Sequence, residues 1–133
     1  MPTRIAPLAI TAFTATSALG HGRGAHADAL RNDRGGLRDN DFTRATLPCA
    51  IGRVDGLESA PVPDAFGEYD CRNNRLAWHG INADGFLDAA RALIERHGAD
   101  RVALIVGTST SSIGATEEGY RALENGRPRF LHR

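Results

Sequence analysis

The sequence predicts an α/β fold in which helices cover a sheet that contains at least one parallel pair of strands. Residues 73–97 have helical periodicity, and residues 102–106 form an unbroken apolar run. The expected elements follow the order strand, helix, long insertion, helix, strand, helix. A strand with apolar side chains on both faces is typical of a sheet that is covered on both sides. The length of 133 residues predicts one domain.

The N-terminal part of the chain is expected to hold one strand and one helix. Residues 10–20 alternate apolar and hydroxyl side chains, which indicates a strand that enters a tight turn at Gly20. Residues 22–30 carry apolar side chains at helical spacing and are predicted to form a short helix. Residues 31–41 are polar and contain two glycines, so they are predicted to form a loop.

The segment from residue 42 to residue 66 has no regular period. Pro48, Pro61 and Pro63 argue against a helix in this region, because proline removes a backbone donor and clashes with the preceding turn. Residues 50–54 have the composition and length of a short edge strand.

The strongest helical pattern covers residues 73–97. Four apolar side chains share one face of this helix: Ala83, Phe86, Ala90 and Leu93. A second apolar stripe, expected to belong to the core, contains Trp78 and Ile81. Gly98 is expected to end the helix in a left-handed conformation. Gly80 and Gly85 each weaken its middle by about 1 kcal/mol relative to alanine, which indicates a bend or a close backbone approach.

A run of five hydroxyl residues, 108–112, follows the predicted buried strand and its terminal Gly107. The run lacks the second glycine of a nucleophile elbow, and it lacks the lysine and the second glycine of a phosphate-binding loop. We therefore expect a loop that passes beneath other elements or lines a pocket. Glu117 and Glu118 then open a helix that ends near Gly126. These two carboxylates point in different directions on a helix, which makes them a poor acid–base pair.

The charge composition excludes several classes of function. The chain has 16 basic and 16 acidic residues, so it lacks the excess positive charge with which proteins neutralise nucleic-acid phosphates. All 16 basic residues are arginine, which excludes a Schiff base, a lysine general base and a phosphate-loop lysine in this chain acting alone. No segment has the roughly 18 consecutive apolar residues of a membrane-spanning helix.

The two cysteines, Cys49 and Cys71, are expected to be reduced thiols in a cytoplasmic protein, because a chain of this length normally builds its own core. The alternative is a small secreted protein with one disulfide. In that case residues 5–19, which follow Arg4, would be a signal peptide. Threonine and serine interrupt this stretch, which favours the strand.

The potential metal ligands do not have the spacing of a metal site. His21 and His26 lie five residues apart and do not share a helix face. The remaining candidates, separated by long irregular spacers, are Cys49, Cys71 and His79. We therefore expect neither a metal nor a cofactor.

Three segments resemble the β-ketoacyl-acyl carrier protein synthases, members of the thiolase fold. Residues 101–121, which begin Arg-Val-Ala-Leu-Ile-Val-Gly-Thr-Ser-Thr-Ser-Ser-Ile-Gly, resemble the family's second core strand and the following turn. Residues 10–20, Ile-Thr-Ala-Phe-Thr-Ala-Thr-Ser-Ala-Leu-Gly, resemble its opening strand, although the family more often has large aliphatic residues and glycine there. Residues 71–78, Cys-Arg-Asn-Asn-Arg-Leu-Ala-Trp, resemble the start of the helix before the second strand. The details are similar to the condensing enzymes of aryl polyene pigment clusters in Gram-negative bacteria.

The resemblance implies a partial thiolase-like fold, namely the first half of the N-terminal α/β layer, in which helices pack on a mixed sheet. Residues 1–133 would then form a single incomplete synthase domain. Such a synthase elongates fatty acid or polyketide chains by decarboxylative Claisen condensation on a cysteine thiolate. In the family that cysteine lies some tens of residues beyond the turn matched by residues 107–114, and the sequence ends at Arg133 before it.

The resemblance also implies that the chain is inactive alone. Neither Cys49 nor Cys71 aligns with the family's nucleophile, none of the five histidines lies in a catalytic motif, and the family's lysine has no counterpart. No catalytic residue is therefore assigned. Thr110 corresponds to a position that lines the acyl pocket near the dimer partner, and Ser109 and Ser111 flank it as candidates for backbone positioning.

The partners implied by the resemblance are an acyl carrier protein and a synthase subunit in a homodimer or heterodimer. The alternative is a non-enzymatic truncated paralogue that binds a full-length synthase or an acyl carrier protein. In either case, part of residues 102–106 and of the long helix would remain uncovered, which favours association.

Overall fold

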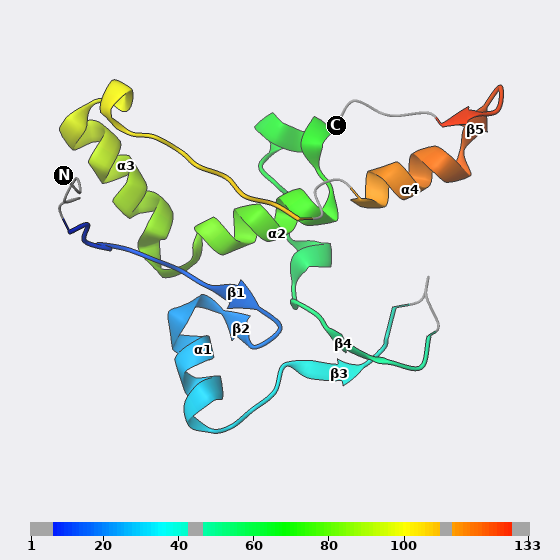
Figure 1. Cartoon of the computed structure of the whole chain (residues 1–133), viewed down its shortest axis with the longest axis horizontal. Coiled ribbons are helices and arrows are strands. Elements are labelled where there is room, and N and C mark those ends of the chain that lie inside the picture. Colours follow the sequence, from blue (N-terminus) through cyan, green and yellow to red (C-terminus); the bar gives the residue numbers. More distant parts are fainter. Residues whose placement is uncertain (1–6, 43–46, 110–112, 129–133) are drawn as a thin grey trace, which may run out of the picture.

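The computed structural model describes residues 7–42, 47–109 and 113–128. The α-helices in these ranges are α1 (Gly22–Arg31), α2 (Arg72–Ile81), α3 (Phe86–His97) and α4 (Ile113–Arg121). The strands are β1 (Thr16–Ser17), β2 (Gly20–His21), β3 (Leu37–Asp39), β4 (Ala50–Gly52), β5 (Leu123–Glu124) and β6 (Arg127–Pro128). The 3₁₀ turns are η1 (Leu57–Ser59), η2 (Asp64–Tyr69), η3 (Ala83–Gly85) and η4 (Ala99–Arg101). The chain is therefore of mixed α/β type, as predicted (Figure 1).

The strands form three separate two-stranded ladders, β1–β2, β3–β4 and β5–β6, and each ladder is antiparallel. The expected parallel pair is absent from the described residues, so that prediction is wrong for this part of the chain. Each ladder joins segments that are close in sequence, whereas a parallel pair needs a long crossover between two full strands. Neither of the two segments predicted as long strands, 10–20 and 102–106, forms one here.

The N-terminal unit is a short hairpin followed by α1. Thr16 pairs with His21 and Ser17 with Gly20, so the turn lies at residues 18–19, just before the predicted position. Helix α1 agrees with the helix predicted over residues 22–30. Gly20 has a φ of 138°, and a Cβ atom there would lie 2.6 Å from the Cβ atom of Ala25. Glycine is therefore required where the hairpin meets the helix.

The irregular middle of the chain forms a second hairpin and two 3₁₀ turns. Strand β4 confirms the edge strand predicted within residues 50–54. Its partner β3 lies inside the predicted loop 31–41, where the polar composition gave no strand signal. The described part of residues 42–66 contains no α-helix, as the prolines predicted: Pro48 precedes β4, and Pro61 and Pro63 lie between η1 and η2.

The long predicted helix is divided into α2 and α3. Asp84 and Gly85 have φ values of 57° and 69°, so the chain turns through the left-handed region between the two helices. The predicted weakening at Gly85 therefore appears as a complete break. The second break residue, Asp84, is uncommon in this conformation, although aspartate tolerates it better than most residues.

The C-terminal helix begins earlier than predicted and is followed by a hairpin. Helix α4 ends at Arg121, and β5 and β6 are joined by Asn125 and Gly126. Both turn residues have positive φ, 52° and 74°, which is the conformation of a type I′ hairpin turn. The prediction that the helix ends near Gly126 is therefore wrong. Asn125 and Gly126 form a hairpin turn instead.

Residues 102–106 are extended but do not form a buried strand, so the prediction of a central strand is wrong for the described chain. Val102 has extended backbone angles, and the segment continues without helical turns past α3 (Figure 1). The exposed fractions of its large side chains are 39% for Val102, 88% for Leu104, 93% for Ile105 and 74% for Val106. We refer to residues 102–106 as the apolar ribbon.

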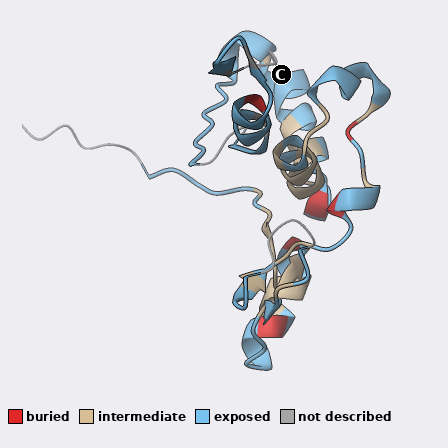
Figure 2. Ribbon diagram, turned by 90° about the vertical axis from the view of Figure 1, so that its right-hand side faces the viewer, coloured by how far each residue is buried: buried red, intermediate tan, exposed pale blue. Residues whose placement is uncertain are grey.

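The described residues bury few apolar side chains, and Figure 2 shows how sparsely the buried positions are distributed. The buried hydrophobic residues are Ala29, Leu57, Val62 and Ala83. The accessible surface of the chain is 11078 Å². A compact folded monomer of the same 14.2 kDa mass would expose only about 6800 Å². The chain thus leaves much more surface uncovered than a self-contained domain of its size.

Leu57 is the largest fully buried side chain of the described residues and belongs to η1, which packs against α2. Its truncation therefore tests this packing. We expect Leu57→Ala to destabilise this region by about 2–5 kcal/mol, because it removes apolar contacts and leaves a cavity. The amides of α2 should then lose protection in hydrogen-exchange mass spectrometry. The control is Leu8→Ala at a side chain that is 91% exposed, which should leave protection unchanged. Equal protection of α2 in both variants would contradict the packing role of Leu57.

Candidate functional site

The acyl-pocket residues implied by the family resemblance cannot be assembled into a site from the described residues. Ser109 lies at a bend and is exposed to solvent. Thr110 and Ser111 lie outside the described residues. The assignment of these three residues therefore stays a prediction.

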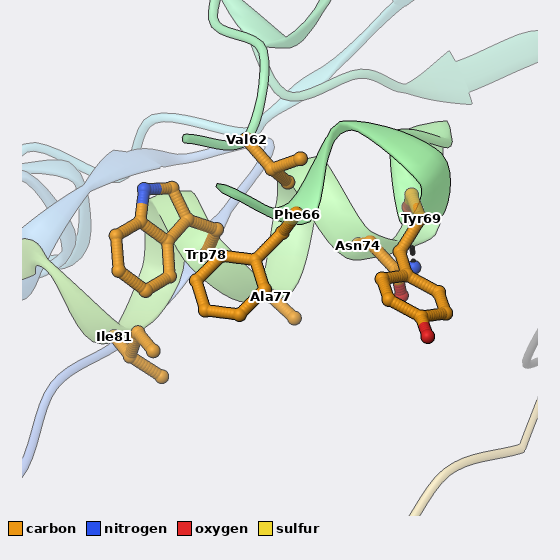
Figure 3. A pocket seen from close by; sticks show the side chains of 7 residues that line it. All are labelled: Val62, Phe66, Tyr69, Asn74, Ala77, Trp78 and Ile81. Atoms are coloured by element: carbon orange, nitrogen blue, oxygen red, sulfur yellow. Dashed lines mark hydrogen bonds between the residues drawn. The ribbon is translucent and has the colours of Figure 1, made fainter. Parts of the chain in front are cut away.

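An apolar pocket of about 300 Å³ lies between η2 and α2 (Figure 3). Its lining residues are Val62, Phe66, Tyr69, Asn74, Ala77, Trp78 and Ile81. The rings of Phe66 and Trp78 lie 6.4 Å apart between centroids and are inclined by 50°, a tilted aromatic arrangement. The pocket could accept an apolar group.

The pocket lining offers little to a chemical reaction. The Asn74 side chain is already used, because its amide donates a hydrogen bond to the Tyr69 carbonyl oxygen at 2.7 Å (Figure 3). Trp78 and Ile81, which we expected to lie in the core, are half-buried and line this open pocket instead. Too few side chains of the described chain pack against this apolar stripe to bury it fully.

The second candidate site is a hydrogen-bonded chain of polar groups where the first hairpin meets α1. Ser17 Oγ lies 2.8 Å from His26 Nε2, and His26 Nδ1 lies 2.8 Å from the carbonyl oxygen of Gly22. The Leu19 backbone N–H donates to Ser17 Oγ at 3.1 Å. Ser17 and His26 are both half-buried. The hairpin and the helix therefore fix a serine hydroxyl against an imidazole.

The carbonyl oxygen of Gly22 determines the roles in this chain of hydrogen bonds. A carbonyl oxygen can only accept, so His26 Nδ1 must carry a proton and donate it. In the neutral imidazole Nε2 is then the acceptor, and the Ser17 hydroxyl donates to it. This arrangement of a hydroxyl, a base and a group that orients the base is typical of an activated nucleophile.

Ser17 also lines a small pocket of about 100 Å³. The other lining residues come from the hairpin and from the segment after β4: Ala18, Gly20, His21, Arg53, Val54 and Asp55. Arg53 adds a positively charged guanidinium group to the lining of this pocket. The pocket thus combines a hydroxyl, an imidazole nearby and a guanidinium group.

The Arg53 guanidinium is held by two carboxylates. Its Nη1 donates to Asp41 at 2.7 Å, and its Nη2 lies 3.5 Å from Glu58. The hydrogen bond from Arg53 is the main cause of a lowered pKa of the Asp41 carboxyl, and the same bond raises the pKa of Arg53. Arg53 Nε is buried and has no hydrogen-bond partner among the described residues. One donor of this side chain therefore stays unused.

Two further histidines connect the hairpin to α2. The rings of His21 and His79 lie 3.9 Å apart between centroids, and His21 Nδ1 lies 3.2 Å from Thr16 Oγ1. Burial lowers the pKa of His79, and the neighbouring His21 lowers it further. The contact between the hairpin and α2 therefore favours a neutral His79.

The other potential ligands do not gather into a metal centre in the described ranges, where no group of three or more His, Cys, Asp or Glu side chains could hold an ion. Cys49 is exposed and Cys71 is half-buried, and both are free thiols. No helix of the described chain is long and apolar enough to cross a membrane.

Comparison of the chain with protein-family models, with curated proteins and with solved structures gives no match. Sequence reasoning missed the Ser17–His26 pair because it considered the histidines only as metal ligands. The available signal was a serine just before a tight turn, with a histidine one turn into the helix that follows.

The lowered pKa of His79 makes its contact dependent on pH. Above its ordinary pKa of 6.5 the side chain is neutral in both the folded and the unfolded chain. As the pH falls below 6.5, the unfolded chain binds the proton first, so the stability falls until the lower folded-state pKa is passed. We expect a lower melting temperature at pH 5.5 than at pH 7.5, measured by circular dichroism.

The variant His79→Gln should reduce this difference between the two pH values, because glutamine cannot be protonated. The matched control is His97→Gln at the exposed end of α3, which should leave the difference unchanged. An undiminished difference in His79→Gln would show that another group causes the pH dependence.

Proposed function

We propose that this chain is the N-terminal part of a β-ketoacyl-acyl carrier protein synthase and acts in fatty acid or polyketide chain elongation. The resemblance of residues 10–20, 71–78 and 101–121 to that family suggested it. The observation that carries it is the apolar ribbon, which is extended, apolar on both faces and exposed. A ribbon of this kind is suited to become a central strand when a neighbouring strand is supplied.

The backbone of the ribbon supports this proposal. No backbone hydrogen bond joins residues 103–106 to another part of the described chain. As far as the described residues extend, both edges of the segment therefore offer N–H and C=O groups to a neighbour. Strand addition to such an edge provides main-chain hydrogen bonds, and the apolar side chains provide burial.

The exposed face of α3 is a second, independent support. Leu93 and Ile94 are each 42% exposed, although helical periodicity places Leu93 on the face expected to cover a sheet. In the proposed synthase, this face and the ribbon would be covered together by the rest of the α/β layer. The large accessible surface of the chain has the same explanation.

The proposed activity needs groups that the remainder of the synthase would supply. The reaction uses a cysteine thiolate to accept the acyl group, and histidines with backbone amides to stabilise the oxyanion and the enolate. This chain would contribute the scaffold and the turn at residues 107–114, with Thr110 at the acyl pocket. The partners would be an acyl carrier protein and a synthase subunit, and the compartment would be the cytoplasm.

The proposal is tested by reading the coding sequence beyond Arg133 and co-expressing its product with this chain. We expect the continuation or an adjacent reading frame to encode an Ala-Cys-Ser-like motif. The two parts should co-purify and form a ketoacyl product from acyl- and malonyl-carrier protein, as detected by mass spectrometry. This chain alone should give no product. Absence of such a coding sequence, or acyl transfer by a clean preparation of the chain alone, would overturn the proposal.

A binding paralogue is distinguished in the same experiment. If the chain co-purifies with a full-length synthase or a carrier protein, and the condensation rate is the same with and without it, the chain is a binding module and not part of the enzyme.

The apolar ribbon should make the isolated chain self-associate. We expect oligomers at micromolar concentration in size-exclusion chromatography with light scattering, because exposed apolar edges pair with one another. The double variant Leu104→Asp with Ile105→Asp should be largely monomeric, since it places a charge on each face of the ribbon. A sharp, cooperative melt of a monomeric wild-type chain would contradict this expectation.

The control for the ribbon variants is Leu8→Asp, which adds a charge at a comparably exposed leucine outside the ribbon. It should leave the oligomers intact. If Leu8→Asp disperses them as well, net charge and not the ribbon controls association.

A further inference from the structure

We propose that Ser17 is a nucleophile that accepts short acyl groups from activated esters, with His26 as its general base. This activity is separate from the condensation described above, because Ser17 and His26 lie on the hairpin and α1, far along the chain from the apolar ribbon. The observation behind it is the hydrogen-bonded chain from Ser17 Oγ to His26 and on to the Gly22 carbonyl oxygen.

The geometry of the pair matches the needs of proton transfer. The distance of 2.8 Å between Ser17 Oγ and His26 Nε2 is within the range over which a general base removes a hydroxyl proton. The Gly22 carbonyl oxygen holds the imidazole in the tautomer with a free Nε2 and stabilises the imidazolium that forms. The Leu19 N–H, which already donates to Ser17 Oγ, fixes the position of the oxygen.

The small pocket beside Ser17 indicates the class of substrate. Its volume of about 100 Å³ is roughly that of three water molecules, which suits an acetyl or another short acyl group. Arg53 lines the same pocket, and its guanidinium group is held there by Asp41 and Glu58. Its positive charge would favour the negative oxygen that develops when the hydroxyl attacks.

The reaction proceeds in two steps. Ser17 Oγ forms a bond to the acyl carbon, and its proton passes to His26 Nε2. The tetrahedral intermediate collapses as the bond to the leaving oxygen breaks, and the leaving group departs with the bonding electron pair. The imidazolium then releases its proton to the leaving group or to solvent. Water hydrolyses the acyl-serine in the same way, with His26 as the base again.

The test uses p-nitrophenyl acetate and the full-length chain. We expect release of p-nitrophenolate and an acetylated protein in the intact mass spectrum, with the label mapped to Ser17 by peptide sequencing. Because the chain has no lysine, no lysine amine competes for the label. The variant Ser17→Ala should lose the label at this peptide. His26→Gln should slow acylation at least about 100-fold, the usual contribution of a general base.

The matched control is Ser59→Ala, which removes a serine whose hydroxyl donates to the Gly56 carbonyl oxygen and has no histidine partner. It should acylate at the wild-type rate. Circular dichroism of each variant separates lost reactivity from lost structure. The wild-type label map is informative without any variant: a label at cysteine, tyrosine or the N-terminus, with Ser17 unmodified, would overturn the proposal.

The acyl-chain length gives a second readout that a purely structural serine would not provide. We expect the octanoate ester to acylate Ser17 much more slowly than the acetate ester, because the pocket is too small for eight carbons. Equal rates would overturn the assignment of the small pocket as the acyl site. This test is independent of the condensation proposal, since it measures neither a carrier protein nor a ketoacyl product.

Discussion

The carboxylate of Asp84 connects the N-terminal unit, which consists of the first hairpin and α1, to the helices α2 and α3. It lies at the break between α2 and α3, and it accepts hydrogen bonds from the Arg23 backbone N–H at 2.8 Å and from Thr14 Oγ1 at 2.9 Å. The Arg23 bond satisfies an amide at the start of α1 and is the main cause of a lowered Asp84 pKa. The left-handed turn of Asp84 is therefore held from outside the helices, by the N-terminal unit. This clamp brings the hairpin to α2, where His21 stacks on His79.

A similar clamp organises the middle of the chain. Arg75 of α2 binds both oxygens of Asp70, and its Nη1 also donates to the carbonyl oxygens of Leu57 and Glu58. These bonds attach η1 to α2 and hold Leu57 in the only fully buried position of a large side chain in the described ranges. Hydrogen bonds and ion pairs of Asp84 and Arg75 thus hold together segments that an apolar core would join in a self-contained domain of this size. The apolar side chains of the ribbon and of the α3 face stay exposed in the described chain.

The sequence predicted local structure better than long-range structure. Helix α1 and strand β4 lie where the sequence predicted a helix and an edge strand. Both predictions used apolar spacing and prolines, which determine structure over only a few residues. The break at Asp84 depends on a carboxylate that binds residues 61 and 70 positions away, which no local pattern reveals. The ribbon failed as a buried strand because burial needs a covering surface, and the described chain does not provide one. The Ser17–His26 pair likewise depends on the turn that brings a strand residue against a helix residue.

The composition of the apolar ribbon has a consequence for the behaviour of the polypeptide during synthesis. Val-Ala-Leu-Ile-Val has high β-propensity, no charge and no proline, which is the signature of a segment that stacks into cross-β fibrils. Arg101 flanks it on one side, and a charge in that position acts as a gatekeeper against such stacking. On the other side the first residue is Gly107, so only one end of the ribbon has this protection. A nascent chain would therefore benefit from chaperone binding at this segment while the segment is exposed.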